Sequence, residues 1–352
     1  MNKIREIYRA NRLPVFQNWM YDSEKEAKNC PKGDIQLIEN LQTGLIYNAA
    51  FCPELLRYDG HYQNEQALSP AFRAHLQRVA RIIERTIGKR SIVEIGCGKG
   101  FFLEMLAAHG FAIKGFDPIY EGNNPAVTKN YFRADLGIRA DGIVLRHVLE
   151  HIQNPVEFLQ SVKEANCGTG RIYIEVPCFD WICEHRAWFD IFYEHVNYFR
   201  LSDFKRMFGI VHECGKLFNG QYLYVVAELS TLKQPRYSKS TGIRFPVDFL
   251  RTLEQTPRKA ECGSLSVVWG GASKGVIFSL LKARGGDPVN IVIDINPKKQ
   301  GKYLPGTGLQ VQSPEKALST LPRGSLIFVM NSNYLCEIMQ MSGNAYNYIG
   351  ID

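Results

Sequence analysis

The chain has 352 residues, of which 45% are hydrophobic and 22% are charged, and 42 Lys and Arg against 35 Asp and Glu give a formal net charge of +7. At roughly 100–200 residues per domain this length predicts two or three domains, and the composition excludes a disordered chain, a collagen and a coiled-coil rod. No apolar run approaches the roughly 20 residues of a membrane-spanning helix, and no basic stripe indicates nucleic acid, so we expect neither partner.

The first 68 residues predict an irregular N-terminal subdomain that serves as a lid. Aromatic residues alternate there with turn residues, and short strands are expected at 35–38 and 44–48. A helix follows from residue 69 to about residue 87, because Phe72, Leu76, Val79 and Ile83 recur at helical spacing. Ser69 before a proline is a typical helix start.

Strands and helices then alternate twice along the chain. Strands are expected at 91–95, 112–116, 142–145 and 171–176, with helices at 98–110 and 147–165. This order indicates βαβ units and a mostly parallel sheet. A polar linker from residue 231 leads to a helix at 246–255 and a second, smaller α/β unit. The predicted domains are therefore 1–68, 69–232 and 233–352.

Nine cysteines, an odd number with no CxxC pair, predict a reduced, cytoplasmic protein. The N-terminal segment MNKIREIYRANRLP has no apolar stretch of the kind found in a secretory signal, which fits this location. Cys30 and Cys52 leave a zinc site open, although no histidine lies near them in the sequence.

The segment VEIGCGKG places Gly96, Gly98 and Gly100 directly after a strand and before a helix, with Glu94 just ahead of them. Glycines allow a tight turn and a close ligand approach. The third glycine comes one residue too early for the dinucleotide fingerprint. Asp117, at the end of the next strand, is placed to accept ribose hydroxyl groups, and Asp135 lies where an adenine amino group would be read.

Together EIGCGKGFF, GFDP and RADLG resemble the first three motifs of class I S-adenosylmethionine-dependent methyltransferases. The resemblance implies that the glycines border the methionine part, Asp117 holds the ribose and either Asp135 or its neighbour Leu136 flanks the adenine. The run IVLRHVLEHIQNP resembles the fourth motif, which implies that Arg146 and His147 lie beside the sulfonium end. A Rossmann-like domain that binds NAD, or no cofactor, is the alternative.

The segment 175–199 is rich in groups for acid–base chemistry. It begins at the carboxyl edge of the predicted sheet, where α/β proteins bind ligands, and it contains the adjacent pair Glu194 and His195. A histidine near the cofactor can remove a proton from a carbon or oxygen nucleophile. From the residues alone, a structural histidine packed among aromatic side chains is equally compatible.

The pattern EVP followed by FDIFYEHVNYF resembles a C-methyltransferase family that acts on nucleotide-linked deoxysugars. Its members have an N-terminal zinc-binding part, a methyltransferase core and a C-terminal Rossmann-like part. The resemblance implies that His195 removes the proton next to a keto group, with Glu194 beside it. It also implies that His151 lines the site and that Tyr62 reaches it from the N-terminal part.

This chain departs from that family at several positions. The paired cysteine ligands of the N-terminal part are missing, with Asn40 and Thr43 near their positions, so we predict no metal site. Phe192 stands where the family has tyrosine, and Tyr193 follows one place later. We expect Tyr193 and Asn197 to contact the acceptor. The altered pattern, including 219–222, indicates a changed acceptor.

The C-terminal segments VVWGGASKGVIFSLL and VIDINPKKQGKYLPGTG resemble the last domain of the same family. A glycine turn entering a helix suits a phosphate group, and Lys274, Lys298 and Lys302 can supply charge for a diphosphate. The alternative is a structural turn with solvated lysines.

The sequence thus predicts an α/β protein with a class I methyltransferase core, a small N-terminal subdomain and a second C-terminal α/β domain. Its expected activity is S-adenosylmethionine-dependent C-methylation of a keto-sugar nucleotide or related keto metabolite after deprotonation by His195. The alternatives are O- or N-methylation of a small molecule and cofactor binding without turnover. We expect a small, phosphorylated acceptor and a monomer or homodimer.

Overall fold

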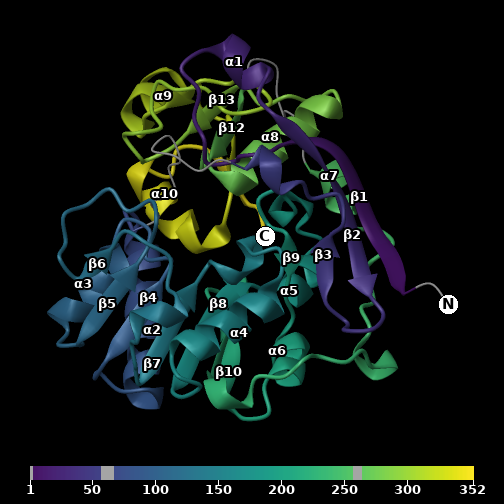
Figure 1. Cartoon of the computed structure of the whole chain (residues 1–352). Helices are drawn as coiled ribbons and strands as arrows, with labels where there is room; N and C mark the ends of the chain where they lie inside the picture. Colours follow the sequence, from purple (N-terminus) through teal and green to yellow (C-terminus); the bar gives the residue numbers. More distant parts are fainter. Residues whose placement is uncertain (1–2, 57–66, 257–263) are drawn as a thin grey trace.

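The computed structural model describes residues 3–56, 67–256 and 264–352 of the chain (Figure 1). Three sheets organise these residues: a four-stranded sheet built mainly from the N-terminal part, a seven-stranded central sheet and a five-stranded C-terminal sheet. The α/β architecture predicted from the sequence, with a Rossmann-like core and a second α/β unit, is confirmed.

The N-terminal sheet is antiparallel and runs in the order β1-β2-β3-β9. Its strands are β1 (Ile4–Pro14), β2 (Lys32–Asn40), β3 (Ile46–Asn48) and β9 (Asn197–Tyr198), and the short helix α1 (Glu24–Lys28) joins the first two. The expectation of an irregular N-terminal part is wrong for β1. Most β1 side chains are exposed, so the strand lacks an apolar alternation and is held by backbone pairing with β2.

The central sheet has the order β10-β11-β8-β7-β4-β5-β6, in which β4 to β8 are parallel and β11 runs antiparallel to β8 and β10. The strands are β4 (Ile92–Ile95), β5 (Ile113–Phe116), β6 (Val127–Thr128), β7 (Gly142–Arg146), β8 (Arg171–Pro177), β10 (Val211–Leu217) and β11 (Tyr222–Glu228). The β10–β11 hairpin was not predicted from the sequence. It completes the sheet beside β8.

The helices of this part are α2 (Pro70–Thr86), α3 (Phe101–Ala108), α4 (Pro155–Ala165), α5 (Phe179–Glu184) and α6 (Leu201–Met207). The predicted start of α2 is confirmed, because the Ser69 hydroxyl accepts a hydrogen bond from the Phe72 amide. The helix expected at 147–165 is divided instead. His147 has φ +52°, a 3-10 turn spans Leu149–His151, and the α-helix begins at Pro155.

The C-terminal sheet is parallel throughout and has the order β14-β13-β12-β15-β16. It contains β12 (Ser266–Trp269), β13 (Ile291–Ile293), β14 (Val311–Gln312), β15 (Leu326–Val329) and β16 (Asn347–Gly350), with α8 (Ser273–Arg284), α9 (Pro314–Thr320) and α10 (Leu335–Met341). The helix expected at 246–255 is shorter, since α7 spans Arg251–Gln255.

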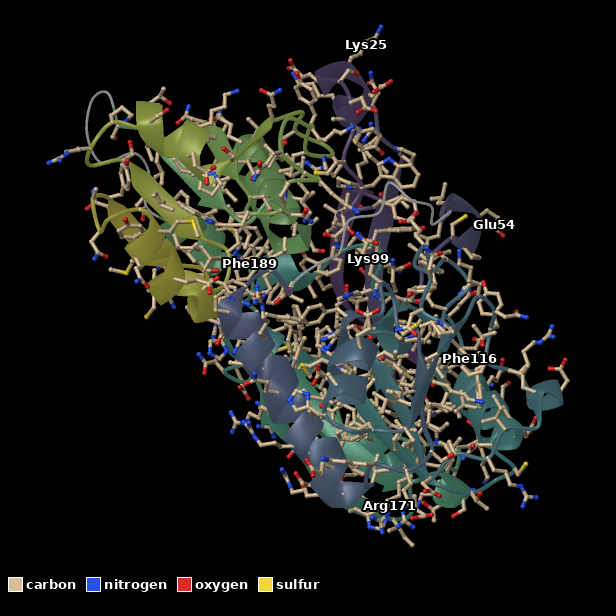
Figure 2. The ribbon with its side chains drawn as sticks, turned by 90° about the vertical axis from the view of Figure 1, so that its left-hand side faces the viewer. Lys25, Glu54, Lys99, Phe116, Arg171 and Phe189 are labelled. Carbon is tan, nitrogen blue, oxygen red and sulfur yellow. The ribbon has the colours of Figure 1, made fainter. Side chains whose placement is uncertain are left out.

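The C-terminal sheet and its helices lie next to the carboxyl edge of the central sheet, and the N-terminal sheet runs along their side (Figure 1). Figure 2 shows Phe189, which follows β8, at the junction of these parts, whereas Arg171, at the start of β8, lies at the far end. Tyr21 and Tyr303 exchange backbone hydrogen bonds, which ties the N-terminal part to the C-terminal domain.

Because β9 falls within the range predicted for the core, the N-terminal sheet crosses the predicted boundary at residue 68, and the three-domain division remains a prediction. Within the residues that the structure describes, no helix combines the length and the apolar character needed to cross a membrane.

Candidate active site

The loop after β4 is shaped by three left-handed glycines. Gly96, Gly98 and Gly100 have φ values of +73°, +56° and +82°, a region that other residues rarely adopt. A Cβ atom on Gly96 would lie 2.4 Å from Cγ2 of Val148, whereas one on Gly98 would meet no atom within 4 Å. The loop therefore packs closely on one side and leaves open space for a ligand at Gly98.

Asp117, just after β5, is tied to this loop. Its Oδ2 accepts a hydrogen bond of 2.8 Å from the Gly98 amide, and its Oδ1 accepts one of 2.9 Å from Ile119. Burial raises the pKa of Asp117, and the two amides oppose that shift. The carboxylate is thus fixed at the carboxyl edge of the sheet, where the sequence predicted a ribose contact.

Glu94, on β4, is a buried carboxyl group whose Oε2 has no hydrogen-bond partner among the described residues. Burial raises its pKa to about 7, although the charge of Arg146 acts in the opposite direction. A buried, unsatisfied carboxyl beside an open glycine loop fits a ligand that brings a cationic group. Asp135, in contrast, is exposed and pairs with exposed Arg133 at 2.9 Å.

A cluster of charged side chains surrounds Glu175, at the end of β8. Its Oε1 lies 3.1 Å from Nε2 of His75, 3.2 Å from the Arg146 guanidinium and 3.2 Å from Nε2 of His147. Its Oε2 accepts a hydrogen bond of 2.7 Å from Tyr173. Arg146 and the two histidines hold the pKa of Glu175 well below its ordinary value although burial acts the other way.

This cluster contains one predicted residue, Arg146, and one residue that was not predicted, His75. Arg146, expected beside the cofactor, is buried against Glu175 and packs over the ring of Phe102. His75 was missed by the sequence analysis, because it lies on the buried face of α2 and looks like an ordinary core position. Its contact with Glu175 joins residues that are 100 positions apart.

His147 lies between two carboxylates. Its Nδ1 is 3.4 Å from Glu150 and its Nε2 is 3.2 Å from Glu175, while its backbone amide donates to the Glu175 carbonyl. Burial lowers the pKa of His147, but the two carboxylates outweigh it and raise the pKa to about 9. The ring also packs edge-on against Tyr222, at 4.6 Å between centroids.

His195 is 8% exposed, and its ring nitrogens make no hydrogen bond with the described residues. Its ring centroid lies 5.0 Å from that of His151 and 4.0 Å from that of Phe192. Burial, and then the charges of His151 and His147, hold the pKa of His195 well below its ordinary value. The imidazole is therefore neutral at pH 7 and can accept a proton.

Glu194 connects this pair to the N-terminal part. Its carboxylate accepts a hydrogen bond of 2.9 Å from the Gln17 amide, and its backbone carbonyl lies 2.9 Å from Nδ1 of His151. Since a carbonyl only accepts, His151 donates from Nδ1, which leaves Nε2 as the acceptor of a neutral ring. Burial also lowers the pKa of His151. Glu194 thus orients His151.

A cavity of about 220 Å³ lies between the central and C-terminal sheets. The central part contributes His147, Glu150, His151 and His195 to its wall. Among the residues that the structure describes, only Glu150, His151 and His195 form a group with ligand atoms close enough for one metal ion, within 4.8 Å of one another. The C-terminal domain contributes the glycine turn before α8 and several polar side chains: Ser273, Lys274, Asp294, Lys299 and Asn331.

The three predicted lysines have different surroundings. Lys274 lines the cavity, but its Nζ lies 2.9 Å from Asp190 and donates to Gln221, so its charge is already paired. Lys298 is exposed, and Lys302 pairs with Asp22. Lys299, which was not predicted, is buried in the cavity wall and donates to the Gly271 carbonyl.

Other predicted acceptor contacts face elsewhere. The Tyr193 hydroxyl accepts a hydrogen bond of 2.8 Å from the Cys52 amide, and Asn197 donates to the Ile152 carbonyl. Neither residue is part of the cavity wall that the described residues form. Tyr62 lies outside the described residues.

The turn at 40–45, where the related family has cysteine zinc ligands, is held by side-chain hydrogen bonds. Oδ1 of Asn40 accepts hydrogen bonds from the amides of Gln42 and Thr43, and the Thr43 hydroxyl accepts one from Leu45. In the described part of the chain, Cys30 and Cys52 belong to no group of three metal-binding side chains.

The chain is similar to known methyltransferases. A family profile described as a methyltransferase domain matches residues 63–209, and one described as a C-methyltransferase C-terminal domain matches residues 243–348. The C-methyltransferase NovU of Streptomyces niveus is 23% identical over 322 residues, which cover 80% of this chain and 76% of NovU.

Solved methyltransferase structures align with part of this chain at low TM-scores. A SAM-dependent methyltransferase from Archaeoglobus fulgidus has 19% identity and a TM-score of 0.35, over 44% of this chain and 93% of its own. The N-methyltransferase NodS from Bradyrhizobium japonicum WM9, solved with S-adenosylhomocysteine, has 15% identity and a TM-score of 0.34, over 46% of this chain and 88% of its own. At these scores the neighbours do not indicate an acceptor.

Proposed function

Because the chain belongs to the class I S-adenosylmethionine-dependent methyltransferases, we propose that it methylates a carbon atom next to a keto group. The proposed acceptor is a small, phosphorylated keto metabolite such as a keto-sugar nucleotide. The relative NovU is a C-methyltransferase, and the C-terminal profile carries the same description, which supports carbon as the nucleophile.

The observation that carries the proposal is the neutral, buried His195 in the wall of the cavity. Carbon acids need a base, whereas many heteroatom nucleophiles already hold a lone pair. His195 has an available lone pair because its ring nitrogens form no hydrogen bond with the described residues, and its lowered pKa keeps it unprotonated at pH 7.

The residues around the glycine loop fit the cofactor. Glu94 offers a buried carboxylate to the ammonium group, Gly98 leaves room for close approach, and Asp117 presents a fixed carboxylate to the ribose. When bound, S-adenosylmethionine supplies an electrophilic methyl group and leaves as neutral S-adenosylhomocysteine.

The chain's own residues then prepare the acceptor. His195 takes the proton from the carbon beside the carbonyl, and the electron pair of that C–H bond becomes the nucleophile as an enolate. The aromatic and C-terminal walls of the cavity keep water away from this carbanion equivalent.

The free thiols of the described cysteines support a cytoplasmic location, and a monomer or homodimer remains our expectation.

The test compares two acceptors that differ in the oxidation state of C4, and therefore in the acidity of the neighbouring C–H bond. The enzyme is incubated with S-adenosylmethionine and either TDP-4-keto-6-deoxyglucose or the same sugar nucleotide reduced at C4, and S-adenosylhomocysteine is quantified. We expect product from the keto form alone, since only its carbon can be deprotonated. Equal turnover of the reduced sugar would instead indicate transfer to oxygen.

A further inference from the structure

We propose that His147 is a catalytic electrophile, a cationic side chain that faces the acceptor oxygen and stabilises its negative charge as the enolate forms. Two histidines of one cavity then have different roles: His195 removes the proton, and His147 donates a hydrogen bond to the enolate oxygen. This inference rests on the proposed function, and it moves His147 from the predicted cofactor contacts to the acceptor side.

The backbone places His147 in the cavity by an unusual conformation. Its φ of +52° lies in the left-handed region, which a histidine adopts only under backbone strain. The Glu175 carbonyl fixes this turn by accepting the His147 amide. Strain of this kind persists where the surrounding structure determines a functional geometry.

The ring has one protected side and one accessible side. Nε2 is buried against Glu175, whereas 23% of the side chain remains exposed and Nδ1 is not among the fully buried atoms. The 3.4 Å contact from Nδ1 to Glu150 lacks hydrogen-bond geometry. The Nδ1 proton is therefore available to an oxygen in the cavity.

The groups that face His147 favour its charged form. Glu150 and Glu175 attract the proton, while Arg146 and His75 share Glu175, and His151 and His195 lie on the cavity side. The result is a pKa of about 9 for His147, against a strongly lowered pKa for His195. Two groups in one site whose pKa values are shifted in opposite directions are the pattern expected of an acid–base pair.

The other cations near the cavity are already engaged. Lys274 pairs with Asp190, Lys299 lies 3.7 Å from Asp294, and Arg146 is buried on Glu175. Among the described residues, His147 is the cation that combines a place in the cavity wall with an accessible donor, which makes it the suitable partner for an enolate oxygen.

The first test measures acceptor deprotonation without methyl transfer. Enzyme saturated with S-adenosylhomocysteine is mixed with TDP-4-keto-6-deoxyglucose in D2O, and deuterium exchange beside the carbonyl is followed by NMR. We expect His147→Asn, a substitution that tolerates the left-handed backbone, to slow exchange about 100-fold at little-changed acceptor KM. Glu150→Gln keeps the ring and should shift the alkaline limb of the exchange rate to lower pH.

The outcomes separate this inference from the proposed function. Exchange that is lost in His195→Gln but normal in His147→Asn overturns the inference and leaves the proposed function standing. Exchange that persists in His195→Gln overturns the proposed function. A second measurement needs no acceptor: ring nitrogen shifts of ¹⁵N-labelled histidines, assigned with His147→Asn, should show a protonated His147 at pH 8, and a neutral ring would refute the inference.

Discussion

The rings of His151 and His195 lie edge to face, 5.0 Å apart, in the wall of one cavity. The carbonyl of Glu194 fixes the tautomer of His151 and directs its unprotonated nitrogen away from that carbonyl. Burial lowers the pKa of both imidazoles, and the positive charge that His151 would carry lowers the pKa of His195 further. This relationship keeps His195 available as a base.

Replacing His195 by glutamine should lower methyl transfer by about 10²–10⁴-fold, because the amide cannot remove a proton from carbon. The affinity for S-adenosylhomocysteine should stay near that of the wild type, since the glycine loop is untouched. Isothermal titration and a product assay measure the two quantities. His212→Gln, on strand β10, is the matched control and should leave both unchanged. Near-normal turnover of the His195 variant would contradict the assignment.

The pH profile should show no acid limb near neutrality. A histidine whose pKa is lowered loses its basic form only at a pH well below its ordinary value of 6.5. We therefore expect kcat/KM to stay constant as the pH falls from 8 to 6.5, and to decline only below that. Activity that halves near pH 6.5 would show an ordinary histidine and contradict the buried, neutral base.

Gly96 and Gly110 provide a matched pair of left-handed glycines. Gly96→Ala brings a Cβ atom within 2.4 Å of the Val148 side chain, whereas at Gly110 no atom lies within 4 Å. Both substitutions carry the conformational cost of about 1 kcal/mol, but only the first deforms the cofactor loop. We expect Gly96→Ala to weaken cofactor binding at least about tenfold and Gly110→Ala to leave it unchanged. Equal dissociation constants of the two variants for the cofactor would contradict the role given to Gly96 in the loop.

The Lys274–Asp190 pair should hold the C-terminal domain against the central part. Removing one partner leaves the other charge buried, which is strongly destabilising, so Lys274→Met should increase amide hydrogen exchange at 188–190 and at the start of α8. The double variant with Asp190→Asn should change less than the sum of the singles. Lys298→Met, at an exposed position, is the control. Additive effects would show that the two side chains are not coupled.

Metal removal should not affect the reaction. Deprotonation of the acceptor needs the lone pair of His195, which a metal ion shared with Glu150 and His151 would occupy. Dialysis against EDTA should leave the rate within about twofold, and added Zn²⁺ should inhibit by competing for the imidazole. Activity lost to EDTA and restored by a divalent ion would contradict the role of His195.

Local features were predictable from the sequence. The start of α2 at Ser69 and the glycine loop depend on neighbouring residues, so their patterns are complete within short segments. The parallel order of strands follows from the alternation of elements along the chain. The adjacency of Glu194 and His195, in contrast, left a structural histidine equally compatible, and only the resemblance to the C-methyltransferase family marked His195, which lines the cavity.

The long-range contacts were not predictable. His75 meets Glu175 across 100 positions, and Gln17 meets Glu194 across 177, and no local pattern encodes either contact. Lys274 looked like a phosphate ligand because Asp190, its partner, lies in a different part of the chain. The pairing of β1 with β2 has register shifts between Glu6 and Tyr8 and between Ala10 and Leu13, which interrupt the alternation of apolar residues and left no periodic signal.

The central claim is transfer of the methyl group to carbon. The enzyme is incubated with S-adenosylmethionine carrying a ¹³C-labelled methyl group and with TDP-4-keto-6-deoxyglucose, and the product is examined by two-dimensional ¹H–¹³C NMR. The account predicts a labelled methyl group whose long-range correlations place it on the carbon beside the keto group. A labelled methyl group on oxygen or nitrogen would contradict it.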